Sequence, residues 1–271
     1  MRNLLKSDLS RIVRDRLFLV VCIIGAAFAV FNPIMYKLIF VVLDADEMLT
    51  AMMGVDAKTM FFSSFSPSNN FGLIMPVLVG IILCKDFSYG TVRNKLICGK
   101  SRFSIFASMF TSATVITCGT MLAHGLLTLA FSLIFFKYQS ESITGADVGY
   151  FFLSLLFEML VYLFVSAIVS YLCASKKNVG GVIVLYIVVT FVFAIIGSIT
   201  QIAALLVDPE KTGLIKFWQF LNNANMFTST AIGYGTKYSA LEVLAIVLPT
   251  VLGTALFALF GFLSFRKKDL K

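Results

Sequence analysis

LFLVVCIIGAAFAVFNPIMYKLIF, residues 17–40, contains a single charged side chain, Lys37. About 20 consecutive, mostly apolar residues in a helix cross the ~30 Å hydrocarbon core of a bilayer. This stretch is therefore long and apolar enough to cross a membrane once. It predicts a spanning helix over about residues 17–43.

Five further apolar stretches predict five more spans. The chain of 271 residues is 59% hydrophobic and 13% charged, which is too apolar for a soluble domain. Only helices and closed barrels satisfy their backbone hydrogen bonds inside lipid, and these runs are not alternating strands. We expect an all-α polytopic membrane protein that forms a single transmembrane domain over 1–271. The further spans are expected at about 70–84, 103–136, 150–173, 179–207 and 240–265.

The positive charges favour one side of the membrane. With six spans, residues 1–16, 85–102, 174–178 and 266–271 share a side and hold all but six of the 22 Lys and Arg residues. Loops rich in Lys and Arg stay in the cytoplasm. Both termini are therefore expected to be cytoplasmic, in a multi-pass protein of a plasma membrane. The six exceptions are Lys37, Lys58, Lys137, Lys211, Lys216 and Lys237.

Charge and cysteine usage exclude other classes of protein. The net charge of +8 is divided among four short segments, so no nucleic-acid-binding groove is expected. None of the five cysteines falls in an expected outer loop, which argues against a disulfide framework.

Two segments outside the spans have helical patterns. Over 1–16, Leu5, Leu9, Ile12 and Val13 repeat at helical spacing, with charged residues elsewhere around the helix, which predicts an interfacial helix. The outer loop 208–239 contains closely spaced aromatic residues. Aromatic rings favour the level of the headgroups, so this loop is expected either to hold a short helix dipping into the outer leaflet or to be an ordinary surface loop.

The loop 85–102 holds the most specific pattern in the chain. Gly90 and Gly99 bracket a segment that could form a short helix, with Thr91 as its N-cap and Gly99 as its terminator. Val92, Leu96 and Ile97 would supply an apolar strip. The alternative is a basic loop that only enforces orientation.

The loop also contains a longer pattern, made up of Asp86, Gly90-Thr91, Arg93-Asn94-Lys95-Leu96, Gly99 and Ser101-Arg102. With these residues it resembles the cytoplasmic loop of type-2 ATP-binding cassette (ABC) exporter permeases. The six spans and the N-terminal helix fit the same family. Within it, the chain is similar to short bacterial permeases that export antimicrobial or cytolytic peptides, including the phenol-soluble modulin and bacitracin-resistance types.

The resemblance implies the membrane subunit of an exporter in the bacterial plasma membrane. The loop would form a coupling helix that docks on a separate ABC ATPase subunit. Expected partners are that ATPase, a second permease protomer (a homodimer), membrane lipid, and an amphipathic peptide or drug as substrate. The implied contact residues are Thr91, Val92, Arg93, Asn94, Lys95, Leu96 and Ile97.

Neither nucleotide binding nor catalysis is expected from the chain itself. Cys98-Gly99-Lys100-Ser101 resembles the end of a P-loop, but Asn94 stands where that motif requires its first glycine. The sequence has a single histidine and no H-E-x-x-H or G-x-S-x-G motif, so we expect no catalytic, cofactor or metal site. The alternative is a stand-alone secondary transporter or channel, which usually has repeated halves that this chain lacks.

Two polar residues inside spans are candidates for a functional pair. Glu158 lies in the fourth span and His124 in the third, at similar expected depths. An unpaired carboxylate at the bilayer centre costs about 2.5–3.5 kcal/mol or more, so such residues usually face the interior of a bundle. His124 and Glu158 could pair across the two helices, or each could bond separately to backbone, Ser or Tyr groups.

Overall fold

The computed structural model describes residues 2–42, 56–68, 70–138, 144–176, 178–207, 212–225, 227 and 237–268. All regular elements in this part of the chain are α-helices. They are α1 (Arg2–Arg14), α2 (Arg16–Val42), α4 (Ala57–Ser63), α5 (Asn70–Ser88), α6 (Thr91–Ile97), α7 (Arg102–Phe135), α8 (Gly145–Ser175), α9 (Val179–Leu206), α10 (Thr212–Ala224) and α11 (Ala240–Lys267).

Six of these helices, α2, α5, α7, α8, α9 and α11, are long and apolar enough to cross a membrane. The all-helical fold and the number of spans expected from the sequence are thereby confirmed. Two helices have an end that differs from the predicted span boundary. Helix α5 continues to Ser88 and so includes charged residues in its last turns, and α8 begins at Gly145, where Thr144 and Asp147 form a capping box.

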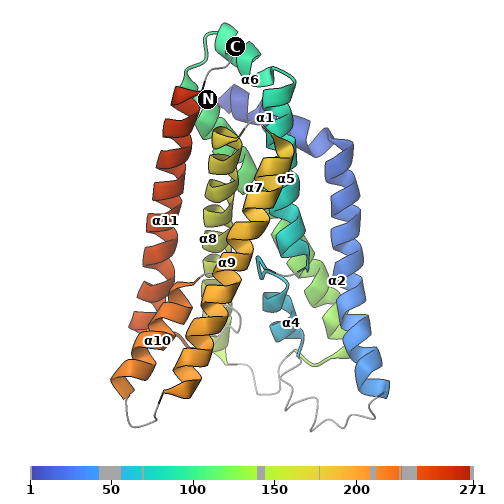
Figure 1. The fold of residues 1–271 in the computed structure, drawn as a ribbon. Helices are drawn as coiled ribbons and strands as arrows, with labels where there is room; N and C mark the ends of the chain where they lie inside the picture. Colours follow the sequence, from blue (N-terminus) through green and yellow to red (C-terminus); the bar gives the residue numbers. More distant parts are fainter. Residues whose placement is uncertain are drawn as a thin grey trace.

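Helices α5 and α8 form the centre of the bundle (Figure 1). In their most apolar 18-residue segments, 61% of the residues are buried, against 17% in α9 and in α11. Helix α8 packs most extensively on α11, and α5 packs on α7, α8 and α9. The outer helices therefore expose apolar faces of the kind that lipid covers.

The short helices lie at the two ends of the bundle. Helices α1 and α6 are at the same end as the last turn of α11, whereas α4 and α10 are at the opposite end (Figure 1). Helix α10 is the helical element expected within 208–239; residues 208–211, 226 and 228–236 of that loop lie outside the described residues.

Helix α4 was not expected from the sequence. It begins at the N-cap Asp56, whose carboxylate accepts a hydrogen bond from the Thr59 backbone N–H at 2.7 Å. Phe61 and Phe62 are buried, and the ring of Phe61 stacks on that of Phe151 in α8 with centroids 5.2 Å apart. Helix α4 therefore closes the end of the bundle with aromatic packing.

Candidate functional site

Helix α6 is a seven-residue helix bounded by two glycines with positive φ. Gly90 has φ 70° and is the N-cap, so the expected N-cap at Thr91 was wrong by one residue. Gly99 has φ 78°, and the N–H groups of Gly99 and Lys100 donate to the carbonyls of Leu96 and Lys95. This is a Schellman ending, which needs a left-handed residue that glycine adopts at least cost. The expected terminator at Gly99 is confirmed.

The expected coupling residues divide between two faces of α6. Arg93, Asn94 and Ile97 are exposed, and Ile97 is 73% exposed. Val92 is 3% exposed and belongs to the hydrophobic core. Thr91, Lys95 and Leu96 are half-buried. The expected apolar strip of Val92, Leu96 and Ile97 is therefore not one surface, because Ile97 lies on the outer face and Val92 on the inner one.

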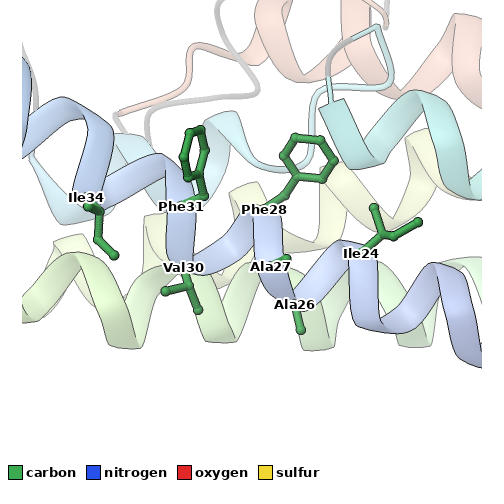
Figure 2. Close-up of a pocket in the computed structure, with 7 residues that line it drawn as sticks. All are labelled: Ile24, Ala26, Ala27, Phe28, Val30, Phe31 and Ile34. Carbon is green, nitrogen blue, oxygen red and sulfur yellow. The ribbon is translucent and has the colours of Figure 1, made fainter.

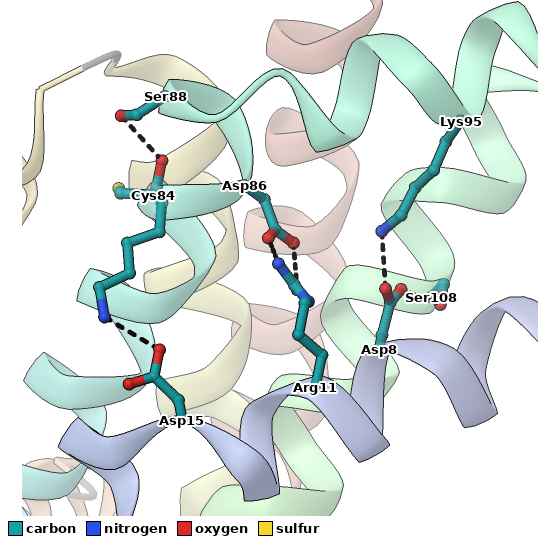
Figure 3. A network of polar contacts seen from close by, with 9 residues as sticks. Asp8, Arg11, Asp15, Cys84, Asp86, Ser88, Lys95 and Ser108 are labelled. Carbon is teal, nitrogen blue, oxygen red and sulfur yellow. Dashed lines mark hydrogen bonds and ion pairs between the residues drawn. The ribbon is translucent and has the colours of Figure 1, made fainter.

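Lys95 fastens α6 to α1. Its Nζ donates to Asp8 Oδ1 at 2.7 Å, while the Ser108 hydroxyl in α7 donates to Asp8 Oδ2 at 2.7 Å (Figure 3). Asp8 is 3% exposed, so both hydrogen bonds form out of contact with water. Charge-assisted hydrogen bonds of this kind are the stronger ones in proteins.

Two further ion pairs join α1 and the residue that follows it, Asp15, to the last turns of α5. The Arg11 guanidinium pairs with Asp86, which is 3% exposed, and Lys85 Nζ donates to Asp15 Oδ2 at 2.9 Å (Figure 3). Burial lowers the pKa of Arg11 from its ordinary value. The hydrogen bond from Lys85 is the main cause that lowers the pKa of Asp15.

These three pairs form one network, which we call the α1 cluster: Asp8, Arg11, Asp15, Lys85, Asp86 and Lys95. It joins α1, α5 and α6, and through Ser108 it also reaches α7. The predicted interfacial helix had its charged residues away from the apolar stripe, and this network was not predicted. A signal was present, since Asp8, Arg11 and Asp15 are spaced by three and four residues and so share a helix face.

A second set of contacts holds the same end of α11. Arg102, the first residue of α7, donates from Nη1 to the carbonyls of Phe265, Arg266 and Lys268 at 3.3, 2.7 and 3.0 Å. The last carbonyls of a helix have no partner within the helix, and a cation there also interacts favourably with the helix dipole. Arg102 thus caps the end of α11.

Lys268 caps the end of α8 in the same way. Its Nζ donates to the carbonyls of Cys173 and Lys176, each at 3.0 Å, and lies 4.1 Å from the ring centroid of Phe87 in α5. The ends of α5, α7, α8 and α11 are therefore joined by side chains as well as by packing.

The candidate pair His124 and Glu158 is not brought together. Both side chains are buried, but among the described residues no ion pair joins them. His124 Nδ1 instead donates to the carbonyl of Gly25 in α2 at 2.9 Å, and its ring lies 4.7 Å from that of Phe71. Helix α7 packs on both α2 and α8, and its rotation turns His124 toward α2. His124 thus has the separate backbone partner that was the alternative to the pair.

Glu158 lies on the inner face of α8 among aromatic residues. It is 4% exposed, and Ser154 and Tyr162 flank it one turn away on either side. The Ser154 hydroxyl is hydrogen-bonded to Tyr238, and the Tyr162 hydroxyl donates to the Phe65 carbonyl at 2.7 Å. Glu158 is therefore a buried acid whose polar neighbours are engaged elsewhere.

A shallow apolar hollow of about 660 Å³ lies along α2. Figure 2 shows the side chains that line it, with Phe28 and Phe31 projecting to the same side of the helix. The lining residues are Ile24, Ala26, Ala27, Phe28, Val30, Phe31 and Ile34. No charged side chain lines the hollow, so it suits an acyl chain or another apolar surface.

In the described ranges, no group of three or more His, Cys, Asp or Glu side chains is arranged to hold a metal ion. Comparison of the sequence with models of known protein families gives no match. A comparison with curated proteins also gives none. The candidate site accordingly rests on its own geometry.

Proposed function

We propose that this chain is the membrane-spanning permease subunit of an ABC exporter, with the type-2 transmembrane architecture and a separate ATPase chain. The observation that carries the proposal is α6, a short helix with an exposed outer face and an inner face tied to two other helices. A soluble partner that presses on the outer face of such a helix would displace the helices that are bound to its inner face. The sequence pattern of residues 86–102 supports the same proposal.

The proposed path of force begins at Arg93, Asn94 and Ile97, the exposed residues of α6. Closure of the ATPase dimer on nucleotide would press on this face. Val92 and Lys95 would transmit the displacement to the core and to α1. Since Asp15 lies directly between α1 and α2 and is bonded to Lys85, α2 and α5 would tilt together.

The proposed cargo is an amphipathic peptide or drug that leaves the bacterial cell. The hollow on α2 and the 28 phenylalanines of the chain offer apolar surface for such a molecule or for lipid. A second copy of the permease would complete the translocation path. No bound cofactor is assigned to this chain, because the ATPase subunit would bind ATP.

Co-purification tests the proposal. The tagged chain would be expressed with the ABC ATPase subunits of its own genome, and bound ATPase would be measured after membrane solubilisation. We expect Arg93→Glu combined with Ile97→Asp to reduce the recovered ATPase by about tenfold or more, as loss of central interface residues does. Lys6→Glu, an exposed charge reversal on α1, is the matched control and should leave recovery unchanged. Equal recovery with the double variant would refute docking on α6.

A second candidate function is a stand-alone carrier driven by an ion gradient, and the buried Glu158 is the observation in its favour. Ionisable residues inside spans often lie on proton or substrate paths. Proteoliposomes containing only this chain separate the two functions. Uptake driven by a proton gradient without ATP, abolished by Glu158→Gln, would establish the carrier, whereas dependence on an added ATPase and ATP would exclude it.

A further inference from the structure

Two cysteines far apart in the chain meet at the end of the bundle that holds α6. The Sγ of Cys84 in α5 lies 3.5 Å from the Sγ of Cys173 in α8. Their residues are 1% and 0% exposed. A disulfide bond requires about 2.05 Å between the sulfurs, so closing this pair needs an approach of about 1.5 Å. Rotations of the two side chains together with a small helix shift would close that distance.

The surroundings of the pair differ from those of an ordinary buried thiol. The Lys268 ammonium donates to the backbone carbonyl of Cys173 at 3.0 Å, which places a cation beside the two thiols. A neighbouring cation is one of the features that distinguish reactive cysteines from inert buried ones. Cys84 is also followed directly by Lys85 and Asp86, which belong to the α1 cluster.

We propose that Cys84 and Cys173 form a redox-sensitive dithiol that a small hydroperoxide oxidises to a disulfide joining α5 to α8. One thiol loses its proton, and the thiolate attacks a peroxide oxygen. The O–O bond breaks, a sulfenic acid forms, and the leaving hydroxide takes up that proton to become water when the oxidant is hydrogen peroxide. The second sulfur then attacks the sulfenic sulfur, the S–O bond breaks, and the departing hydroxyl takes a proton to become water. The two thiols lose two electrons and two protons, and the peroxide is reduced.

Burial determines which oxidant can act. Both thiols are out of contact with solvent, so a bulky charged disulfide such as oxidised glutathione cannot reach them. A small, uncharged peroxide can enter during local opening of the helix ends. Cys98, which is exposed next to α6, is open to both kinds of reagent and serves as an internal comparison.

The disulfide would limit the movement that α6 passes to the spanning helices. It would tie the last turns of α5 to α8 immediately before the residues that bind α1. This consequence depends on the proposed function: in an exporter driven through α6, the oxidised form would be unable to tilt α5 relative to α8. The structure thus assigns to this pair a disulfide lock that a small peroxide forms and that a small, uncharged dithiol such as dithiothreitol reduces.

Mass spectrometry of the full chain in native membranes tests the disulfide itself. Membranes would be treated with hydrogen peroxide or with oxidised glutathione, denatured, alkylated and digested. We expect a linked peptide pair containing Cys84 and Cys173 after peroxide, its absence after oxidised glutathione, and its disappearance on reduction with dithiothreitol. Cys84→Ala and Cys173→Ala should each abolish the link, while Cys118→Ala, a half-buried cysteine in α7, should retain it. Full alkylation of both thiols after peroxide in the wild type would overturn the proposal, whatever the variants do.

A transport measurement tests the lock separately. In proteoliposomes with the ATPase, we expect oxidation to lower ATP-driven transport at least tenfold and dithiothreitol to restore it, with no loss in Cys84→Ala. Unchanged transport in protein that is fully disulfide-linked would overturn the lock. If reduced protein shows no response to ATP while the linked peptides form, the proposed function fails and the dithiol assignment stands.

Discussion

At the scale of single residues, Asp8 joins α1 to two other helices. It accepts hydrogen bonds from Lys95 and Ser108, and it does so at 3% exposure. Asp8 therefore fixes the rotation of α1 against both α6 and α7. Breaking a buried ion pair is costly because the remaining charge is left without a partner.

We expect Asp8→Asn to lower the free energy of unfolding by about 1–3 kcal/mol, the usual cost of leaving a buried polar group poorly satisfied. Lys95→Met in the same chain removes the unpaired ammonium, so the double variant should lose less than the sum of the two single losses. Thermal unfolding in detergent micelles measures all three. Ser7→Ala, on the exposed face of α1, is the control and should change stability by no more than about 0.5 kcal/mol. Strict additivity would show that Asp8 and Lys95 do not interact.

Asp15 makes the stability of this end depend on pH. Its pKa is lowered, first by the hydrogen bond from Lys85 and also by one from the Leu17 backbone N–H at 2.9 Å. A carboxyl whose pKa is lower in the folded state stabilises the fold above its ordinary pKa of about 3.9. That contribution is lost as the pH falls through the folded-state value.

We therefore expect Asp15→Asn to be less stable than the wild type at pH 7 and to approach it as the pH falls below about 3.9 and through the lowered folded-state pKa of Asp15. Melting temperatures of both proteins across this range give the difference directly. A difference that is constant with pH would mean that the charge of Asp15 does not stabilise the fold.

At the scale of elements, α2 packs on α5 and α7 through a glycine. A Cβ atom built on Gly25 would lie 2.5 Å from the buried ring of Phe71, and the Gly25 carbonyl also accepts the hydrogen bond from His124. Glycine lets helices approach closely in membranes, where packing largely replaces the hydrophobic effect. This contact positions the first span.

We expect Gly25→Ala to destabilise the protein by about 1–3 kcal/mol, because the added methyl group displaces the Phe71 ring in a filled core. Gly119→Ala in α7 is the matched control, since nothing lies within 4 Å of its added Cβ. Alanine favours helix more than glycine does, so the control should be neutral or slightly stabilising. Thermal unfolding of the two variants distinguishes them, and equal effects would exclude the close contact.

Only part of the structure of α6 follows from its local sequence. Its two glycine ends follow from residue type, because a left-handed residue is cheap only for glycine. Residue type does not determine which face of α6 is buried, since Val92 and Ile97 are both apolar and only Val92 is buried. The difference lies in what packs against the helix.

At the scale of the whole molecule, the ends of the bundle differ in charge. The end with α1, α6 and the last turn of α11 carries most of the lysines and arginines, and Cys98 is exposed there. The opposite end carries α4 and α10. Positive charge held in the cytoplasm predicts the first end inside the cell.

Labelling of intact cells checks this orientation. We expect a membrane-impermeant maleimide to leave native Cys98 unmodified until the cells are permeabilised, and Cys98→Ser to remove the signal. In that background Lys237→Cys, at an exposed position before α11, should react in intact cells. Labelling of Cys98 without permeabilisation would reverse the orientation and remove α6 from the cytoplasm.

The number of spans and the glycine boundaries of α6 are readable from the chain alone, and the loop charges predict which end of the bundle is cytoplasmic. Each depends on local properties, namely the length of an apolar run, the charge of the next loop and the backbone freedom of one residue. Pairings between helices depend on rotation about the helix axes. An apolar spanning helix gives little sign of which face turns inward, because both lipid and core accept the same residues. Three contacts therefore follow from the tertiary packing of the helices and not from the local sequence. They join His124 to Gly25, Asp8 to Lys95 and Cys84 to Cys173.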